Sequence, residues 1–117
     1  MTGKRGGQAI RPAQQHEWTL RYHSREVAEG WANLCAQQPG VLATLYDRLT
    51  ENPRHTDNPG RQSQLHGHLR VIHVNGELLE QWQYEVSGGG RVWYAINDAT
   101  RTVWITKASA RHPNETK

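Results

Sequence analysis

Residues 77–106 read ELLEQWQYEVSGGGRVWYAINDATRTVWIT, and they carry the strongest structural signal in the 117-residue chain. In its first part, residues 77–86, the apolar side chains of Trp82, Tyr84 and Val86 alternate with polar ones. A period of two is typical of a strand that buries one face and exposes the other. We therefore expect a long strand here, with its aromatic side chains directed into the core.

Two turns divide the rest of this stretch into further strands. The serine and three glycines of residues 87–90 favour a tight turn, and the polar residues 97–101 favour another. Between and after these turns, residues 91–96 and 102–106 alternate in the same way. Strands joined by such short connections lie antiparallel, so the sequence predicts a meander.

The meander extends towards the N-terminus through residues 68–74, which are rich in apolar and β-branched side chains. Asn75-Gly76 separates them from the strand at residues 77–86. Asn-Gly between two strands is the strongest short signal for a hairpin, because both residues accept a positive φ. The preceding residues 53–64 are polar and contain two prolines, so we expect a loop there.

The segment before that loop predicts one strand and two helices. Residues 16–23 alternate strictly between polar and apolar, as a half-buried strand does. Ser24 is a good helix N-cap, and apolar residues at helical spacing follow over residues 25–38. Pro39-Gly40 ends that helix, and a second amphipathic helix runs from about residue 41 to residue 51. Two helices with so short a connection form an antiparallel hairpin.

Together these elements predict an α+β fold: one N-terminal strand, a two-helix hairpin, and then an antiparallel meander of about four strands. We expect a single domain over residues 16–117. A flexible basic tail is expected over residues 1–15, which are polar and rich in glycine.

Composition narrows the class of function. The formal net charge is +3, and seven histidines add to it below pH 7, which suits a polyanionic partner such as nucleic acid. The alternative is a mildly basic domain without such a partner. Cys35 is the only cysteine, so neither an intrachain disulfide nor a cysteine-based zinc cluster is expected. The first 15 residues lack the apolar stretch of a secretory signal, and no apolar run approaches the roughly 20 residues that span a bilayer. We therefore expect a cytoplasmic protein without membrane contact.

The phases of the strands predict a polar face on the sheet. Val92, Tyr94 and Ile96 form the apolar set of their strand and should face the helices. Arg91 and Trp93 then point to the other face of the sheet.

Three more side chains share that second face by the same argument. Trp104 is out of phase with its apolar neighbours, His112 lies on the same side if the phase continues, and Glu85 is out of phase with Trp82 and Tyr84. An arginine beside exposed indoles is suited to RNA, because guanidinium pairs with phosphate and indole stacks on bases. The alternative is that the tryptophans only cover the second face or bind a protein partner.

Three short motifs, in this order of elements, resemble those of the RelE/ParE superfamily of toxin–antitoxin toxins. Leu65-His66-Gly67 is similar to the family's Leu-Lys-Gly, and Arg91-Val92-Trp93-Tyr94 is similar to its strand motif of Arg, an apolar residue, any residue and Tyr. Arg111-His112-Pro113 lies where those toxins carry a C-terminal Arg, His or Tyr group. The resemblance covers about residues 16–113 and implies a RelE-like, microbial ribonuclease-like scaffold.

The resemblance also implies an activity and roles for four residues. RelE-type members cleave mRNA in the ribosomal A site by attack of a 2′-hydroxyl on the adjacent phosphate, which implies an endoribonuclease that inhibits translation. Arg91 would stabilise the charge on the phosphate, and His112 would be the general acid or base. Glu85 is a candidate base, by analogy with members that have a carboxylate there. Lys107 would add positive charge, although its phase directs it to the core unless a bulge intervenes.

The remaining candidates would bind the RNA substrate: Arg61, Arg70, Arg111, Trp93 and Trp104. The chain departs from the family in lacking the lysines with which ribosome-dependent members hold RNA. Arg54, Arg61 and Arg70 with His55, His66 and His68 are candidates to replace them, and an ordinary polar loop is the alternative. The Asn-Gly hairpin also lengthens the span before Arg91 by about one strand. We expect no cofactor and no metal, because the histidines lack a tight metal-binding spacing.

Three functions remain open at this point. The first is an endoribonuclease that acts on RNA, either free or on the ribosome, and the combination of Arg91, Glu85 and His112 favours it. The second is a ParE-like inhibitor of DNA gyrase, which needs no acid or base. The third is a non-catalytic protein-interaction module. A toxin of either kind would be held inactive by a cognate antitoxin that wraps over its surface.

Overall fold

The structure is a computed structural model that describes residues 5–6, 9, 12 and 16–110. Most of the predicted tail over residues 1–15 lies outside the described residues. Arg111 and His112, two of the predicted site residues, lie outside them as well.

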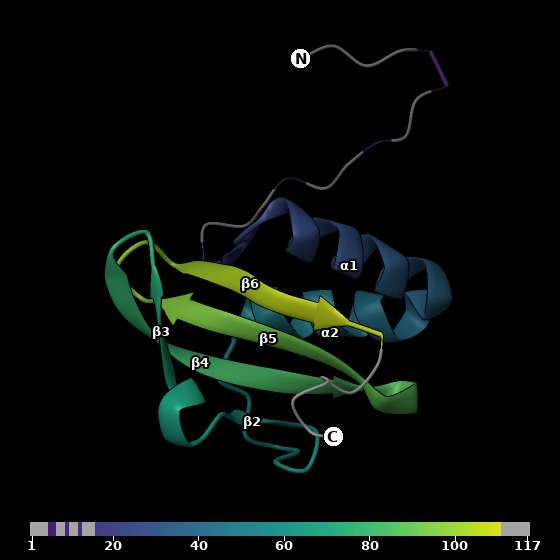
Figure 1. The fold of residues 1–117 in the computed structure, drawn as a ribbon. Coiled ribbons are helices and arrows are strands. Elements are labelled where there is room, and N and C mark those ends of the chain that lie inside the picture. Colours follow the sequence, from purple (N-terminus) through teal and green to yellow (C-terminus); the bar gives the residue numbers. More distant parts are fainter. Residues whose placement is uncertain (1–4, 7–8, 10–11, 13–15, 111–117) are drawn as a thin grey trace.

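Two helices and a six-stranded sheet make up the described part of the chain (Figure 1). In chain order they are β1 (Thr19–Tyr22), α1 (Arg25–Gln37), α2 (Pro39–Glu51), β2 (Gln62–Gln64), β3 (Val71–Val74), β4 (Glu77–Val86), β5 (Gly90–Asn97) and β6 (Thr102–Ser109). Two short segments, η1 (Gly67–Leu69) and η2 (Ser87–Gly89), connect strands. The predicted α+β class, the helical hairpin and the meander are confirmed.

The strand order is β1-β6-β5-β4-β2, with β3 also paired to β4 beside β2. β1 runs parallel to β6, and the other pairs are antiparallel, so the sheet is mixed. This adds to the predicted meander one strand, β2, which lies at the end of the segment expected to be a loop. Its sequence, Gln62-Ser63-Gln64, has no apolar alternation that would have indicated a strand.

Both helices cover one face of the sheet (Figure 1), and the main core lies between the helices and that face. Apolar residues at helical spacing on α1 and α2 meet the alternating set of β4, β5 and β6, as the sequence predicts. The fully or nearly fully buried members are Val27, Trp31, Leu34, Leu42, Leu45, Leu49, Trp82, Tyr84, Val86, Val92, Tyr94, Ile96, Val103 and Ile105. The polar set of the same strands therefore lies on the opposite face.

The ends of the helices follow local chemistry. The Ser24 hydroxyl accepts a hydrogen bond from the Val27 backbone N–H at 3.2 Å, which confirms the predicted N-cap. The second helix begins at Pro39, earlier than expected from residue 41. Proline is favoured in the first turn of a helix, where its missing N–H costs nothing, so Pro39-Gly40 starts α2 instead of only ending α1.

Asn75 and Gly76 have φ values of 52° and 85°, so the predicted hairpin turn between β3 and β4 is confirmed. The expected strand over residues 68–74 is shorter than predicted, because its first part forms η1. Val74 and Leu79 from this hairpin pack with Ala95 in a second, smaller apolar cluster on the face away from the helices.

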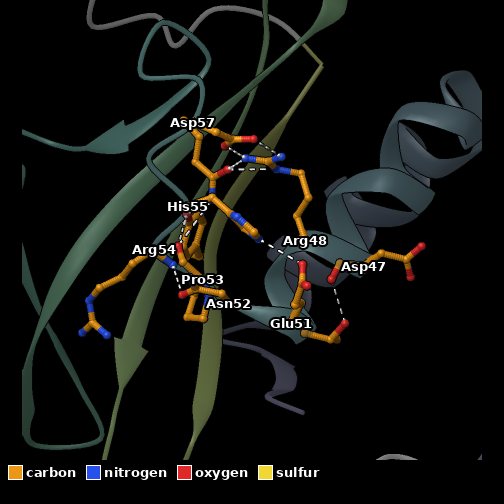
Figure 2. Close-up of polar contacts among 11 residues, drawn as sticks. Asp47, Arg48, Glu51, Asn52, Pro53, Arg54, His55 and Asp57 are labelled. Atoms are coloured by element: carbon orange, nitrogen blue, oxygen red, sulfur yellow. Dashed lines mark hydrogen bonds and ion pairs between the residues drawn. The ribbon is translucent and has the colours of Figure 1, made fainter. Parts of the chain in front are cut away.

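Side chains from α2 and β5 anchor the chain between α2 and β2, and Figure 2 shows the α2 contact between Arg48 and Asp57. Arg48 donates to the Asp57 carboxylate at 2.7 Å and to the buried Gln62 side chain at 2.7 Å. The Tyr94 hydroxyl donates to the Pro53 carbonyl and accepts from the Gln62 amide, both at 2.8 Å. Burial raises the pKa of Tyr94 and keeps its hydroxyl a donor. The expected loop thus presents β2 and Arg61 to the sheet edge in a defined position.

Within the described residues, neither helix has the length and apolar character that a membrane span requires.

Candidate active site on the sheet face away from the helices

The polar face predicted from strand phase is present in the structure. Val92, Tyr94 and Ile96 of β5 are buried against the helices, so Arg91 and Trp93 lie on the other side of the sheet. Because cross-strand partners lie on the same face of a sheet, the register identifies the residues of β4 and β6 that share this face. The Cα partners of Arg91 are Glu85 on β4 and Ser109 on β6.

Glu85 and Arg91 form an ion pair at the end of the β4–β5 hairpin. Arg91 Nη1 lies 3.1 Å from Glu85 Oε2, and the two residues are direct cross-strand partners. The Arg91 side chain is 13% exposed and that of Glu85 is 45% exposed. The carboxylate is therefore open to solvent while a largely buried guanidinium holds it in place.

Arg61 lies on the other side of Glu85. The Glu85 backbone N–H donates to the Arg61 carbonyl at 2.7 Å, and Arg61 Nη1 donates to the Glu85 carbonyl at 3.1 Å. A substrate-binding arginine predicted from the sequence is thus brought next to a predicted catalytic carboxylate by the chain entering β2.

A surface hollow of about 410 Å³ opens beside this group. Its lining is mainly polar and consists of Asn58, Gly60, Arg61, Glu85, Val86, Ser87, Gly88 and Gly89. The glycine run predicts only a turn, and no sequence signal predicts Asn58 or the glycines as site residues. Gly88 and Gly89 have φ values of 76° and 87°, which other residues rarely adopt. The glycines therefore allow the backbone conformation that forms one wall of this hollow.

Lys107 joins the same face because β6 contains a bulge. The register shifts between Trp93 and Tyr94, so Trp93 pairs with Lys107 while Tyr94 pairs with Ile105. Lys107 Nζ lies 4.6 Å from the centre of the Trp93 ring, a cation–π distance. The irregularity needed to turn Lys107 away from the core phase is therefore present.

The expectation of two exposed indoles is wrong for Trp93. Its residue exposure is 8%, Lys107 lies over its ring, and its Nε1 donates to Gln83 Oε1 at 3.3 Å. In this arrangement the ring is a support for the ammonium group and has no open face for a base. Trp104 is half-buried and packs against the second apolar cluster.

Arg70, another predicted cation, does not lie at the Glu85–Arg91 pair. Arg70 is exposed beside η1, and its carbonyl accepts from the Gln81 N–H at 2.8 Å. Gln81 is four residues from Glu85 along β4, which is roughly 13 Å of strand. Arg111 and His112 lie outside the described residues.

Arg54 forms ion pairs with two carboxylates. It contacts Glu80 at 2.7 Å and Asp98 at 2.8 Å, and so ties the chain after α2 to β4 and to the β5–β6 turn. The hydrogen bond from Arg54 lowers the pKa of Asp98. Burial acts to raise the pKa of Glu80, but hydrogen bonds from Arg54 and the Trp82 indole outweigh it and lower that pKa. Arg54 therefore serves the fold, and its charge is largely balanced.

This arrangement offers one carboxylate paired with Arg91, with Arg61 bonded to the backbone of the same glutamate and Lys107 on the same face of the sheet. A carboxylate in that setting can accept a proton, and the cations can stabilise negative charge on a neighbouring phosphate. In the described part of the chain, no three His, Cys, Asp or Glu side chains gather closely enough to hold a metal ion.

The chain is similar in structure to chains of two solved toxin–antitoxin complexes. A chain of the archaeal RelE–RelB complex from Pyrococcus horikoshii OT3 superposes with a TM-score of 0.56, at 14% sequence identity, over 84% of this chain and 98% of that one. A chain of the toxin–antitoxin complex RelBE2 from Mycobacterium tuberculosis gives a TM-score of 0.48 at 17% identity, over 87% of this chain and 100% of that one. No protein-family profile and no curated protein sequence matches this chain. The fold is thus RelE-like, as the sequence resemblance implied.

Proposed function

We propose that this chain is the toxin of a toxin–antitoxin pair and that it inhibits translation in the cytoplasm by cleaving mRNA. The observation that carries the proposal is the Glu85–Arg91 ion pair, at 3.1 Å, on the helix-free face of a RelE-like fold, with Glu85 also lining a polar hollow. Arg61 and Lys107 add positive charge on either side of that pair. Such a cluster suits a polyanion better than a neutral ligand.

The proposed reaction is attack of an RNA 2′-hydroxyl on the adjacent phosphorus. Glu85 accepts the 2′-hydroxyl proton, the 2′-oxygen bonds to phosphorus, and the bond from phosphorus to the 5′-oxygen breaks. His112 donates a proton to that leaving oxygen, so the products are a 2′,3′-cyclic phosphate and a 5′-hydroxyl. Arg91, with help from Lys107, stabilises the additional negative charge on the phosphate oxygens.

The remaining residues would act in binding. Arg61 lines the hollow beside Glu85, where its guanidinium would pair with a phosphate of the bound RNA. Arg70, Arg111 and Trp104 would hold RNA further from the reacting phosphate. Trp93 would contribute by supporting Lys107, since its ring is buried beneath that side chain.

A cognate antitoxin is the proposed protein partner. The archaeal structure with this fold is a RelE–RelB complex, and by analogy an antitoxin would bind and inactivate this chain. Exposed apolar side chains provide contact area for such a partner: Tyr22, Tyr46, Val71 and Leu78.

Induction in a bacterial host tests the proposal. Wild type should arrest growth with loss of intact mRNA, and both Arg91→Ala and His112→Ala should relieve the arrest. Arg25→Ala removes the same charge as Arg91→Ala from an exposed position on α1, on the opposite side of the sheet, and should leave the arrest unchanged. Co-expression of a small protein encoded beside the gene should restore growth.

Two other results would contradict the proposal. Arrest with damaged DNA and intact mRNA would indicate a gyrase inhibitor on the same fold. Normal growth at confirmed levels of folded protein would indicate a non-catalytic interaction module.

A further inference from the structure

One irregularity in β6 determines what faces the proposed site. Thr106 is the extra residue of the bulge, because Ile105 and Lys107 pair with the consecutive residues Tyr94 and Trp93. Beyond the bulge, Ala108 pairs with Val92 and packs against the main core, while Lys107 lies on the other face. A regular strand would place Lys107 on the helix side, among buried apolar residues.

A buried glutamine holds the bulged residue. Gln81 is 2% exposed and lies on β4, with β5 between it and β6. The Thr106 hydroxyl donates to Gln81 Oε1 at 2.6 Å, so the glutamine side chain spans the central strand. The cross-strand partner of Gln81 on β5 is Ala95, whose small side chain leaves room for this crossing.

The same glutamine is fixed at its other end. Gln81 Nε2 donates to the Leu69 carbonyl of η1 at 2.9 Å, which orients the amide so that its oxygen faces Thr106. A buried amide with both ends bonded has one favourable orientation. Leu69, Gln81 and Thr106 thus form a rigid connection from the β2–β3 segment to the bulge.

We propose that Thr106 and Gln81 are positioning residues for Lys107. Their hydrogen bond holds the bulge in the geometry that keeps the Lys107 ammonium over Trp93 and on the Arg91 face. This inference rests on the proposed function for its catalytic part, because it assigns to Lys107 a defined place beside the reacting phosphate. Neither residue touches that phosphate.

The geometric part is tested without RNA, by NMR of protein labelled with ¹³C-lysine. The chain has three lysines, Lys4, Lys107 and Lys117, so the Lys107 signal is assigned by its loss in Lys107→Arg. The Trp93 ring should shift the side-chain protons of Lys107 upfield in wild type. Thr106→Val and Gln81→Met should remove that shift, and Thr106→Ser should retain it.

Thr102→Val is the matched control. Thr102 lies on the same strand and donates from its hydroxyl to the Thr100 carbonyl at 3.1 Å, away from the bulge. Its loss should leave the Lys107 shift unchanged. An unchanged shift in folded Thr106→Val and Gln81→Met would overturn the inference whether or not the protein cleaves RNA.

The catalytic part is tested by RNA cleavage with the same variants. Thr106→Val should lower kcat by about 10-fold to 100-fold with KM nearly unchanged, because misplacement of one group slows the reaction more than it weakens binding. Thr106→Ser should restore kcat. If Lys107 moves in Thr106→Val while kcat equals that of Thr102→Val, positioning by Thr106 has no catalytic role. If wild type itself does not cleave RNA, the proposed function fails while the NMR result stands.

Discussion

At the scale of single residues, the partner of each arginine decides what it can do. Arg54 binds two carboxylates, whereas Arg61 bonds a backbone carbonyl of the strand that carries Glu85. Both lie in the polar segment that follows α2, and nothing in the sequence around them separates their roles. The distinction comes from which strands the chain meets after leaving α2, and that is a property of tertiary structure.

The Arg54 contacts predict a pH-dependent contribution to stability. Glu80 and Asp98 have lowered pKa values in the folded protein, so their stabilisation is present above the unfolded values of about 4 and is lost as pH falls through the lowered folded values. Arg54→Met should destabilise the protein by about 1 kcal/mol at pH 7, since the pairs are partly exposed. The difference from wild type should shrink below about pH 4. Urea unfolding at pH 7 and pH 3 measures it, and a difference that is constant with pH would contradict this explanation.

At the scale of elements, the contact between α1 and β6 is unusually close. A Cβ placed on Gly30 would lie 2.2 Å from the Ala108 carbonyl oxygen, a backbone atom that cannot move without moving β6. The bulge at Thr106 is what turns Ala108 towards α1. The irregularity that turns Ala108 towards α1 therefore also directs Lys107 to the other face.

Gly30→Ala should therefore destabilise the fold. Overpacking typically costs about 1–3 kcal/mol, and alanine recovers up to about 1 kcal/mol through its helix propensity. Gly40→Ala is the matched control, because Gly40 lies in α2 with nothing within 4 Å of an added Cβ. That control should be neutral or slightly stabilising. Equal thermal midpoints for the two variants would contradict the close helix–sheet contact.

Elements with a strong local signal could be predicted from the sequence. The alternation in residues 77–86, the Asn75-Gly76 turn and the Ser24 cap depend on a few neighbouring residues, and all three are present. β2 and the bulge could not be predicted, because both depend on the partner strand. For the site, strand phase placed Arg91 and Glu85 on one face. It failed for the exposure of Trp93, since the side chain covering that ring, Lys107, is fixed by the bulge.

Across the molecule as a whole, one face of the sheet packs against the helices and the other carries the residues of the candidate site. The helices and one face of the sheet enclose the main core, so changes to the cations on the other face leave that core intact. Arg61, Arg91 and Lys107 lie on or beside that face, and under the proposed function they would form the basic surface that binds RNA. This division is the reason to expect variants of these cations to keep the fold while losing function.

The basic surface predicts a salt-dependent affinity for single-stranded RNA. The logarithm of the binding constant should fall linearly with the logarithm of salt concentration, with a slope of about −0.7 for each phosphate neutralised. Arg61→Ala should reduce the magnitude of that slope by about 0.7, and Arg25→Ala should leave it unchanged. Fluorescence anisotropy over a salt series measures the slope. Equal slopes for the two variants would show that Arg61 does not neutralise an RNA phosphate.

The decisive test of RNA cleavage is an assay of a defined RNA with purified protein, with ribosomes present in one series and absent in another. The products should carry a 2′,3′-cyclic phosphate and a 5′-hydroxyl, and a single 2′-deoxy substitution at the cleaved position should abolish cleavage. Glu85→Gln, which keeps the size of the side chain and removes the proton acceptor, should cleave at least about 100-fold more slowly. RNA that stays intact in both series, or cleavage that persists at the 2′-deoxy position or at full rate in Glu85→Gln, would contradict the proposed mechanism.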